Sequence, residues 1–252
     1  MTVKIAIAGA AGRMGQQLIA ATQARAAAQL SGTFDRSGDY ETDMAAAFSG
    51  ANVVIDFTLP AATSDIMAAA RTAGAAYVLG TTGHDPDQRQ GIERAAQTMP
   101  ILWAANFSLG VNVLLGLVAQ AAKALPADSF DLDILELHHN RKVDAPSGTA
   151  LALGHAATKG RSQSLDQVAT YARQGETGAR AVGEIGFATL RGGDNPGEHT
   201  VMLVGEGERI ELSHRALDRS IFAKGAITAA IWLHENRKDQ PGLYSMSDVL
   251  GL

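Results

Sequence analysis

An α/β fold with two domains is predicted by three features of the sequence. In the first 106 residues, short apolar runs rich in β-branched residues alternate with alanine-rich helical segments. A glycine-rich turn joins the first run to the first helical segment, and after Asn106 strand-like segments recur between glycine-rich turns. Alternation of strand and helix is typical of a parallel sheet with helices on both faces. We therefore expect a Rossmann-like parallel sheet domain and a second α+β domain with a mixed sheet.

The elements of the first domain follow from the hydrophobic pattern. Residues 3–8, VKIAIA, form a short apolar run that glycine bounds, and the alanine-rich residues after the turn have helical composition. The predicted elements are strands at 3–8, 30–34, 53–57, 77–79 and 101–103, and helices at 12–28, 60–72 and within 85–97.

The pattern changes to α+β after Asn106. We predict helices at 111–125, 149–158 and 220–233, and strands at 131–138, 186–190, 199–204 and 209–214. The chain is expected to enter the second domain near residue 107 and to return near residue 217. One domain would then comprise residues 1–106 and 217–252, and the other residues 107–216.

The composition excludes several classes of function. The chain has 252 residues, of which 46% are hydrophobic and 19% charged, as in an ordinary globular protein. Its 21 Lys and Arg against 26 Asp and Glu argue against non-specific nucleic-acid binding. It has no cysteine, which removes thiolate chemistry, and neither a leader nor a long apolar stretch is apparent. We expect a cytoplasmic protein with no membrane or nucleic-acid partner.

Residues 9–15, GAAGRMG, carry the first candidate site. Gly9, Gly12 and Gly15 lie between the first strand and the first helix, and Asp35 follows the second strand. In a dinucleotide-binding unit such glycines bring the backbone close to the pyrophosphate, and the acid binds the adenosine ribose. A tight turn without a ligand is the alternative. Because Ala11 replaces the usual second glycine, the closest approach is expected at Gly12.

Coenzyme choice depends on the residue after this acid. Arg36 can pair with the 2′-phosphate of NADPH, or it can be a solvated loop residue. Two further loops, GTTG at 80–83 and AANFS at 104–108, follow predicted parallel strands, where open α/β sheets bind their ligands. Their small residues suit a nicotinamide and its ribose, although such loops are also common without a ligand.

The segment HHNRKVDAPSGTA at 138–150 is the second candidate site. Its basic groups run into a predicted helix start at 146–149, where free backbone N–H groups and the helix dipole favour an anion such as a carboxylate. Lys142 adds a positive charge, and Gly148 has no side chain to keep the anion away. His138 and Lys142 suit general-acid chemistry. The alternatives are a solvated basic turn and a metal site, but further metal ligands are missing. Arg141 fits a surface or subunit contact equally well.

These segments resemble the dihydrodipicolinate reductase family of bacterial lysine biosynthesis, also called 4-hydroxy-tetrahydrodipicolinate reductase. The resemblance rests on GAAGRMG, VVIDFTLP at 53–60, GTTG, AANFSLGVN at 104–112 and HHNRKVDAPSGTA. IGFATLRGGDNPGEHTV at 185–201 and GLYSMSDVL at 242–250 are similar too, so that almost the whole chain is covered.

The resemblance implies an oxidoreductase that uses NADH, NADPH or both, and a homotetramer assembled through the second domain. It implies cofactor contacts from Gly9, Ala10, Ala11, Gly12, Arg13, Met14, Asp35, Arg36, Gly80, Thr81, Thr82, Ala104, Ala105, Asn106 and Phe107. It also implies that His138 and Lys142 are the acid pair, and that the substrate carboxylates are held by His139, Lys142, Gly148 and Thr149, with Ser147 at the same helix start. No metal is implied.

Two departures from the family concern the cofactor. Asp35 stands where many members have glutamate, and the stretch from Ser37 to Ala51 is short. The first leaves the choice between NADH and NADPH open, and the second leaves the adenine end more exposed.

The expected reaction is hydride transfer from the nicotinamide to a ring carbon of a cyclic, conjugated imine dicarboxylate, with a proton from Lys142 or His138. One alternative is another Rossmann reductase of amino-acid-derived substrates, such as aspartate or homoserine dehydrogenase, which would need a different basic constellation. The other is a non-catalytic NAD(P)H-sensing protein. The acid groups at 138 and 142 argue against it, as does the lack of an apparent helix-turn-helix module.

Overall fold

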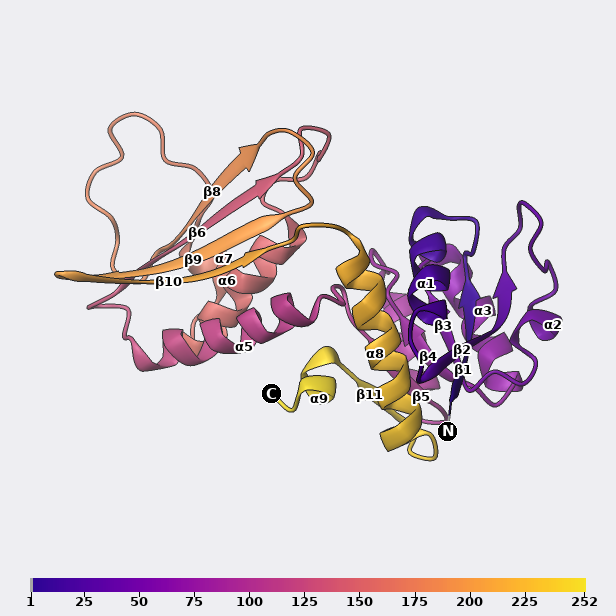
Figure 1. Ribbon diagram of the computed structural model, residues 1–252. Helices are drawn as coiled ribbons and strands as arrows, with labels where there is room; N and C mark the ends of the chain where they lie inside the picture. The colour runs from indigo at the N-terminus through magenta and orange to yellow at the C-terminus, as the bar shows by residue number, and fades with distance from the viewer. Residues whose placement is uncertain (1) are drawn as a thin grey trace. The chain divides into compact units, whose positions relative to one another are not determined.

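The computed structural model describes residues 2–252 and divides the chain into two compact units (Figure 1). The first comprises Met1–Leu109 and Ser220–Leu252, and the second comprises Gly110–Arg219. The chain thus enters the second unit after Leu109 and returns to the first at Ser220. The predicted borders at 106/107 and 216/217 lie within about three residues of these positions.

The first unit is built on a six-stranded parallel sheet of order β11-β5-β4-β3-β1-β2. Its strands are β1 (Val3–Ala8), β2 (Ala28–Phe34), β3 (Val53–Asp56), β4 (Ala76–Leu79), β5 (Pro100–Trp103) and β11 (Gly242–Tyr244). The strands β3 and β4 are buried along their whole length because helices cover both faces. The predicted Rossmann-like parallel sheet is confirmed.

Two apolar clusters fill the two sides of this sheet. Helices α1 (Arg13–Gln23) and α8 (Ser220–Arg237) pack on one side, over a cluster that includes Ile5, Ile55 and Val78. Helices α2 (Met44–Phe48), α3 (Pro60–Thr72) and α4 (Pro86–Ala95) accompany the other cluster, around Tyr77 and Ile101. Helix α9 (Met246–Leu250) packs beside α8.

The second unit contains a mixed five-stranded sheet of order β10-β9-β6-β8-β7. Its strands are β6 (Asp131–His138), β7 (Ala169–Thr170), β8 (Ile185–Arg191), β9 (Glu198–Gly205) and β10 (Glu208–Arg215). The central strand β6 pairs in parallel with β8 and antiparallel with β9. This mixed sheet is also as predicted.

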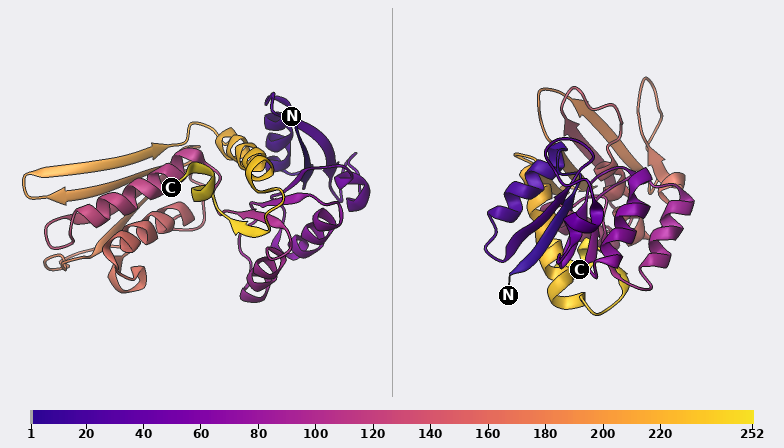
Figure 2. Two further views of the ribbon diagram at one scale, coloured as in Figure 1. Left: turned by 90° about the horizontal axis from the view of Figure 1, so that it is seen from below. Right: turned by 90° about the vertical axis from the view of Figure 1, so that its right-hand side faces the viewer.

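Helices cover one face of the second sheet. Figure 2, left, shows α5 (Leu109–Ala124, magenta) and α6 (Gly148–Arg161, pink) on the same side of the orange β9–β10 hairpin. Their apolar side chains pack with Leu132, Ile134 and Val201 in a third cluster. The short helix α7 (Leu165–Val168) joins this layer through Leu165. Leu132 and Ile134, which alternate along β6, therefore point towards the helices.

The structure differs from the predicted elements mainly at short segments. Elements α2, α7, β7, β11 and α9 have five residues or fewer and were not predicted. The helix predicted at 12–28 ends at Gln23, because the chain from Ala28 on is drawn into β2 by pairing with Val3. Tertiary pairing here overrides the helix propensity of alanine.

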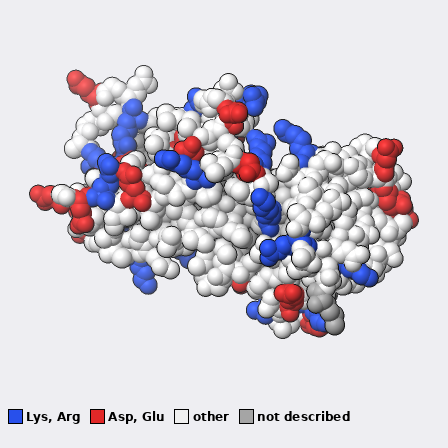
Figure 3. Space-filling model, in the orientation of Figure 1, with Lys and Arg blue, Asp and Glu red and all other residues white. Residues whose placement is uncertain are grey.

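Acidic and basic side chains are interspersed on the face drawn in Figure 3. Within residues 2–252, no helix is both long and apolar enough to cross a bilayer, and no three His, Asp or Glu side chains gather as a metal site.

Candidate active site

The glycine loop turns tightly between β1 and α1. Gly9 has a φ of +78°, in the left-handed region that favours glycine. A side chain at Gly15 would lie 2.1 Å from the Gly9 carbonyl oxygen, so this glycine lets α1 pack on the loop. At Gly12, the N-cap of α1, an added Cβ would meet only the Gly9 oxygen, at 3.2 Å. The expected close approach at Gly12 is thus sterically available.

Asp35 holds this loop from the end of β2. Its Oδ2 accepts a hydrogen bond from the Ala11 N–H at 2.9 Å, and its Oδ1 accepts from the N–H and hydroxyl of Ser37. Desolvation alone would raise the pKa of Asp35, but these hydrogen bonds hold it below its ordinary value. The carboxylate is therefore ionised at neutral pH and is half-buried beside the loop.

A cavity of about 350 Å³ opens between the glycine loop and the end of β3. Asp35, Arg36 and Phe57 are among its lining residues, together with Gly9, Gly12, Phe34, Thr58, Leu59, Ala62 and Ile66. Arg36 is exposed at this cavity, whereas Arg13 on α1 is exposed but is not among its lining residues. Ala10 is buried below the loop and Met14 is half-buried. The structure thus brings Gly9, Gly12 and Asp35 to one cavity.

The loops after β4 and β5 meet at an aromatic pair. A Cβ at Gly80 would lie 2.3 Å from the Phe57 ring, so only glycine fits there. The Phe57 ring in turn packs on Phe107, with 5.2 Å between the centroids. Thr82 and Ala105 are exposed at the loop tips, while Ala104 and Asn106 are half-buried.

A buried carboxylate lies beneath these loops. Asp56 has no exposed surface and accepts hydrogen bonds from the Thr58 N–H and hydroxyl and from the Tyr77 hydroxyl. The Thr81 hydroxyl is 3.4 Å away. Asp56 therefore connects the loop after β3 with the loop after β4.

The second candidate site lies at the end of β6 and the start of α6. Helix α6 begins at Gly148, one residue before the predicted start, and Ser147 caps it by accepting a hydrogen bond from the Ala150 N–H at 3.2 Å. A Cβ at Gly148 would meet nothing within 4 Å. The first turn of α6 is thus open to an anion at this glycine.

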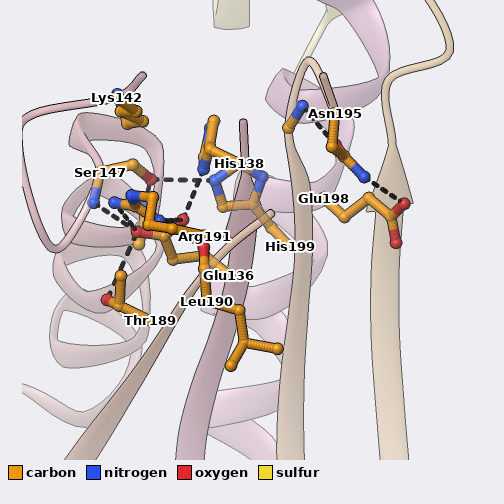
Figure 4. Close-up of polar contacts among 12 residues, drawn as sticks. Glu136, His138, Lys142, Ser147, Thr189, Leu190, Arg191, Asn195, Glu198 and His199 are labelled. Atoms are coloured by element: carbon orange, nitrogen blue, oxygen red, sulfur yellow. Dashed lines mark hydrogen bonds and ion pairs between the residues drawn. The ribbon is translucent and has the colours of Figure 1, made fainter. Parts of the chain in front are cut away.

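His138 is held at the end of β6 by a buried acid (Figure 4). Its Nδ1 lies 2.5 Å from Oε2 of Glu136, and the Glu136 side chain is 1% exposed. Arg191 donates to both oxygens of Glu136, at 2.8 and 2.9 Å, and the Ser147 N–H donates to Oε1 at 3.0 Å. Desolvation would raise the pKa of Glu136, but Arg191, His138 and the Ser147 N–H hold it below its ordinary value.

Lys142 and His139 have other partners in the turn that follows. The Lys142 Nζ lies 2.9 Å from Oδ1 of Asp144, which holds the pKa of Asp144 below its ordinary value. Nε2 of His139 lies 3.2 Å from Nη2 of Arg219. Desolvation and the neighbouring cations, Arg219 first, lower the pKa of His139. The turn therefore gathers several positive groups next to the start of α6.

His199 lies against both parts of this site. Its ring packs edge-on against His138, with 5.1 Å between the centroids, and its Nε2 lies 3.1 Å from the Ser147 hydroxyl. Burial is the main reason why its pKa falls to about 4. His199 is therefore neutral at physiological pH.

Comparison with known proteins identifies the family of the chain. Residues 3–107 match the model of the N-terminal part of dihydrodipicolinate reductase, and residues 110–250 match that of its C-terminal part. The chain belongs to the dihydrodipicolinate reductase family. The resemblance of the sequence motifs to this family is thereby confirmed.

Similar proteins cover nearly the full length. The chain is 49% identical to 4-hydroxy-tetrahydrodipicolinate reductase of Caulobacter vibrioides, over 99% of this chain and 97% of that protein. Identity to the same enzyme of Alkalilimnicola ehrlichii is 46%, over the full length of both. The dipicolinate-bound dihydrodipicolinate reductase of Paenisporosarcina sp. TG-14 shares the fold, with a TM-score of 0.78, 22% identity and coverage of 97% and 98%.

Reasoning from the sequence missed several residues at the two sites of this family member. They are Asp56 and Phe57 in the first unit and Glu136, Arg191, His199 and Arg219 in the second. One signal was available for Glu136, because it precedes His138 by two residues on a strand and so shares its face. Arg191 and His199 lie in the segment 185–201 that resembles the family, but no residue pattern there marks either side chain as part of the site, and none marks Arg219.

Proposed function

We propose that the chain reduces 4-hydroxy-tetrahydrodipicolinate to tetrahydrodipicolinate with NADH or NADPH, in the diaminopimelate route to lysine. The observation that carries the proposal is the open start of α6 at Gly148, beside a histidine whose Nδ1 is bound by Glu136. A carboxylate site and an acid group are what this reduction needs from the protein. The names of the similar full-length reductases agree with this activity.

The cavity of the first unit fits a dinucleotide. Gly12 leaves the backbone open to a pyrophosphate at the N-terminus of α1, and the ionised Asp35 retains acceptor capacity for ribose hydroxyls. Arg36 lines the same cavity and suits a 2′-phosphate. The cofactor would contact Gly9, Ala10, Ala11, Gly12, Arg13, Met14, Asp35, Arg36, Gly80, Thr81, Thr82, Ala104, Ala105, Asn106 and Phe107. When bound, the reduced nicotinamide supplies a hydride to a ring carbon of the substrate.

The second unit would bind the substrate and supply a proton. In the proposal, the N–H groups at Ser147, Gly148 and Thr149 hold one carboxylate, and His139 and Lys142 bind the dianion. Arg219, next to His139, adds a further positive charge. The 4-hydroxyl group would first leave as water together with a hydrogen of the neighbouring ring carbon, which gives a conjugated ring. His138 or Lys142 then gives a proton to this ring as electron density arrives with the hydride. The dipicolinate bound to the related solved structure is a planar dicarboxylate of this kind.

Assembly and location belong to the same proposal. The face of the second sheet away from α5 and α6 exposes apolar side chains, including Leu190 (50% exposed) and Val204 (38%). Such a face suits a second copy of the sheet, in a homotetramer. We place the enzyme in the cytoplasm.

The deciding experiment generates the unstable substrate in the cuvette from pyruvate and aspartate semialdehyde with the preceding synthase. Loss of NADH and of NADPH absorbance is then followed separately. We expect oxidation that depends on the synthase, and no oxidation when pyruvate and aspartate semialdehyde are replaced by oxaloacetate and ammonia. Cofactor binding without oxidation in either assay would favour the sensing alternative, and oxidation with oxaloacetate and ammonia would favour an aspartate dehydrogenase.

A further inference from the structure

The central strand of the second sheet carries a charged residue in its buried row. On β6 the side chains of Leu132, Ile134, Glu136 and His138 all point to the face that the helices cover. Leu132 and Ile134 continue the apolar core, whereas Glu136 brings a carboxylate to a position with 1% exposure. A buried carboxylate is costly unless it is paired and hydrogen-bonded. We therefore expect a role of Glu136 that depends on its carboxylate and that an apolar residue could not perform.

Both carboxylate oxygens of Glu136 accept hydrogen bonds from groups at the end of β6, at the start of α6 and on Arg191. Oε2 accepts from His138 Nδ1 and from Arg191, and Oε1 accepts from Arg191 and from the Ser147 N–H (Figure 4). The Ser147 N–H belongs to the N-cap residue of α6, where the substrate carboxylate is expected. One side chain therefore fixes both the histidine and the helix start.

Arg191 extends this hold to the turn that carries Lys142. Besides its two bonds to Glu136, it donates to the carbonyl oxygen of Asp144 at 2.6 Å. Asp144 is also the residue whose carboxylate pairs with Lys142. The turn between β6 and α6 is thereby bound to the same buried carboxylate through the planar guanidinium, a geometry that lysine does not provide.

The bond to Glu136 also decides which nitrogen of His138 faces the site. Because an ionised carboxylate only accepts hydrogen bonds, Nδ1 carries a hydrogen and Nε2 is the nitrogen that can gain or lose one. Nε2 lies against Gly197, where an added Cβ would be 2.8 Å away. Gly197 has a φ of +148°, so glycine suits both the backbone and the space beside Nε2.

We propose that Glu136 and Arg191 are positioning residues for the reduction: Glu136 fixes the Nδ1–H form of His138, and the pair holds this acid, the Lys142 turn and the start of α6 in one arrangement. This inference rests on the proposed function, because it assigns the pair a part in that reaction. Neither residue need touch the substrate.

The test replaces Glu136 by glutamine and Arg191 by lysine. In both variants kcat is expected to fall by about 10- to 100-fold, a part of the roughly 10²–10⁴-fold that a positioned acid contributes. The Kd of NADPH, measured by fluorescence, should stay within about twofold, because its binding residues lie in the first unit. For R191K, the Kd of pyridine-2,6-dicarboxylate should also rise, since the turn and the helix start lose their common anchor.

A second measurement does not depend on turnover. The ¹⁵N shifts of His138, assigned with H138Q, report which ring nitrogen carries the hydrogen. The wild type should show the Nδ1–H form, and E136Q should lose it. The matched control is E93Q, which removes one charge from an exposed glutamate of α4 in the first unit and should change neither readout.

Any one of three outcomes would overturn the inference. The first is a kcat within threefold of wild type in both E136Q and R191K, and the second is an unchanged His138 tautomer in E136Q. The third is a loss of folding together with NADPH binding in both variants, which would leave the pair only a structural role. If E136Q does not fold, the kcat of R191K and the tautomer of His138 in the wild type test the inference. A wild type that oxidises neither cofactor would refute the proposed function. The effect of Glu136 on the His138 tautomer would still be tested by the ¹⁵N shifts, which do not depend on turnover.

Discussion

The carboxylate of Asp35 accepts a hydrogen bond from the backbone N–H of Ala11 at 2.9 Å, so the acid after β2 holds the glycine loop in place. Asp35 thus has two parts in the proposed cofactor site: it shapes the loop and offers acceptors to the ribose.

Replacing Asp35 by alanine is expected to weaken NADH binding by roughly tenfold or more, because hydrogen bonds to a charged group contribute about 1.5–3 kcal/mol. Fluorescence titration measures the Kd. Asp39, exposed in the same loop, provides the control D39A. Equal Kd values for D35A and the wild type would contradict the role of Asp35.

Replacing Gly15 by alanine is expected to destabilise the first unit. The new methyl group would lie 2.1 Å from the Gly9 oxygen and 2.8 Å from the Ala10 Cα, and overpacking of this kind costs about 1–3 kcal/mol. Thermal unfolding should show a lower Tm. In G91A the added Cβ meets only a distant arginine atom on α4, so this control should be about 0.5–1 kcal/mol more stable than wild type. A Tm for G15A at or above the wild-type value would be inconsistent with the packing.

Replacing Lys142 by alanine should lower turnover much more than cofactor affinity. The proposal gives Lys142 a place at the substrate, and a positioned acid contributes about 10²–10⁴-fold to the rate. Steady-state kinetics with each cofactor, combined with NADH titration, separate the two effects. K159A, at an exposed position near the end of α6, is the control. Equal losses of turnover and cofactor affinity would remove Lys142 from the chemistry.

Acidification should destabilise the second unit through His199. Its pKa is about 4 when folded and about 6.5 when unfolded, so between these values the unfolded chain binds the additional proton. The free energy of unfolding should therefore fall as the pH decreases from about 6.5 to about 4, by roughly 3 kcal/mol in total. Urea denaturation of H199Q should show a shallower dependence on pH in this window, while H155Q, at an exposed site, should retain the wild-type slope. Identical slopes for H199Q and the wild type would refute this assignment.

Replacing Leu190 by glutamate should dissociate the proposed tetramer. The side chain is half exposed on the uncovered sheet face, and a buried unpaired charge at a subunit contact is costly. Sedimentation velocity should give a smaller species for L190E and the wild-type species for L252E, at an exposed position of the first unit. A wild type that sediments as a monomer would dismiss this assembly.

The two sheets could be predicted from the sequence because most of their strands appear as apolar runs bounded by glycine-containing turns. The run VKIAIA and the glycine turn after it indicate the first βα unit, and β1 and α1 are found there. Short elements such as β11 depend on pairing with β5, which no local pattern reports. Ala24–Ala27 have helical composition but leave the helix, since the next residues complete a sheet pair with β1.

The candidate sites show the same division between local and distant information. His138, Lys142 and Gly148 lie in one segment, and the chemistry proposed for them rests on residues that are neighbours in the sequence. Glu136 shares a strand face with His138, but a glutamate in a strand is usually solvent-facing, so the sequence does not single it out. Its partner Arg191 is 55 residues away and is brought beside it only by the pairing of β6 with β8, where His138 and Arg191 are in register.

The central place of β6 gives the two proposed acids different local stabilities. β6 bonds to a strand on each side, so its backbone amides are protected from exchange with solvent until the sheet itself opens. His138 ends this strand, whereas Lys142 lies in the turn beyond it, with its N–H bonded to the His139 carbonyl. That turn is joined to the sheet through the hydrogen bond from Arg191 to the Asp144 carbonyl oxygen. Of the two proposed acids, one is thus held by the sheet itself and the other through the hydrogen bonds of its turn.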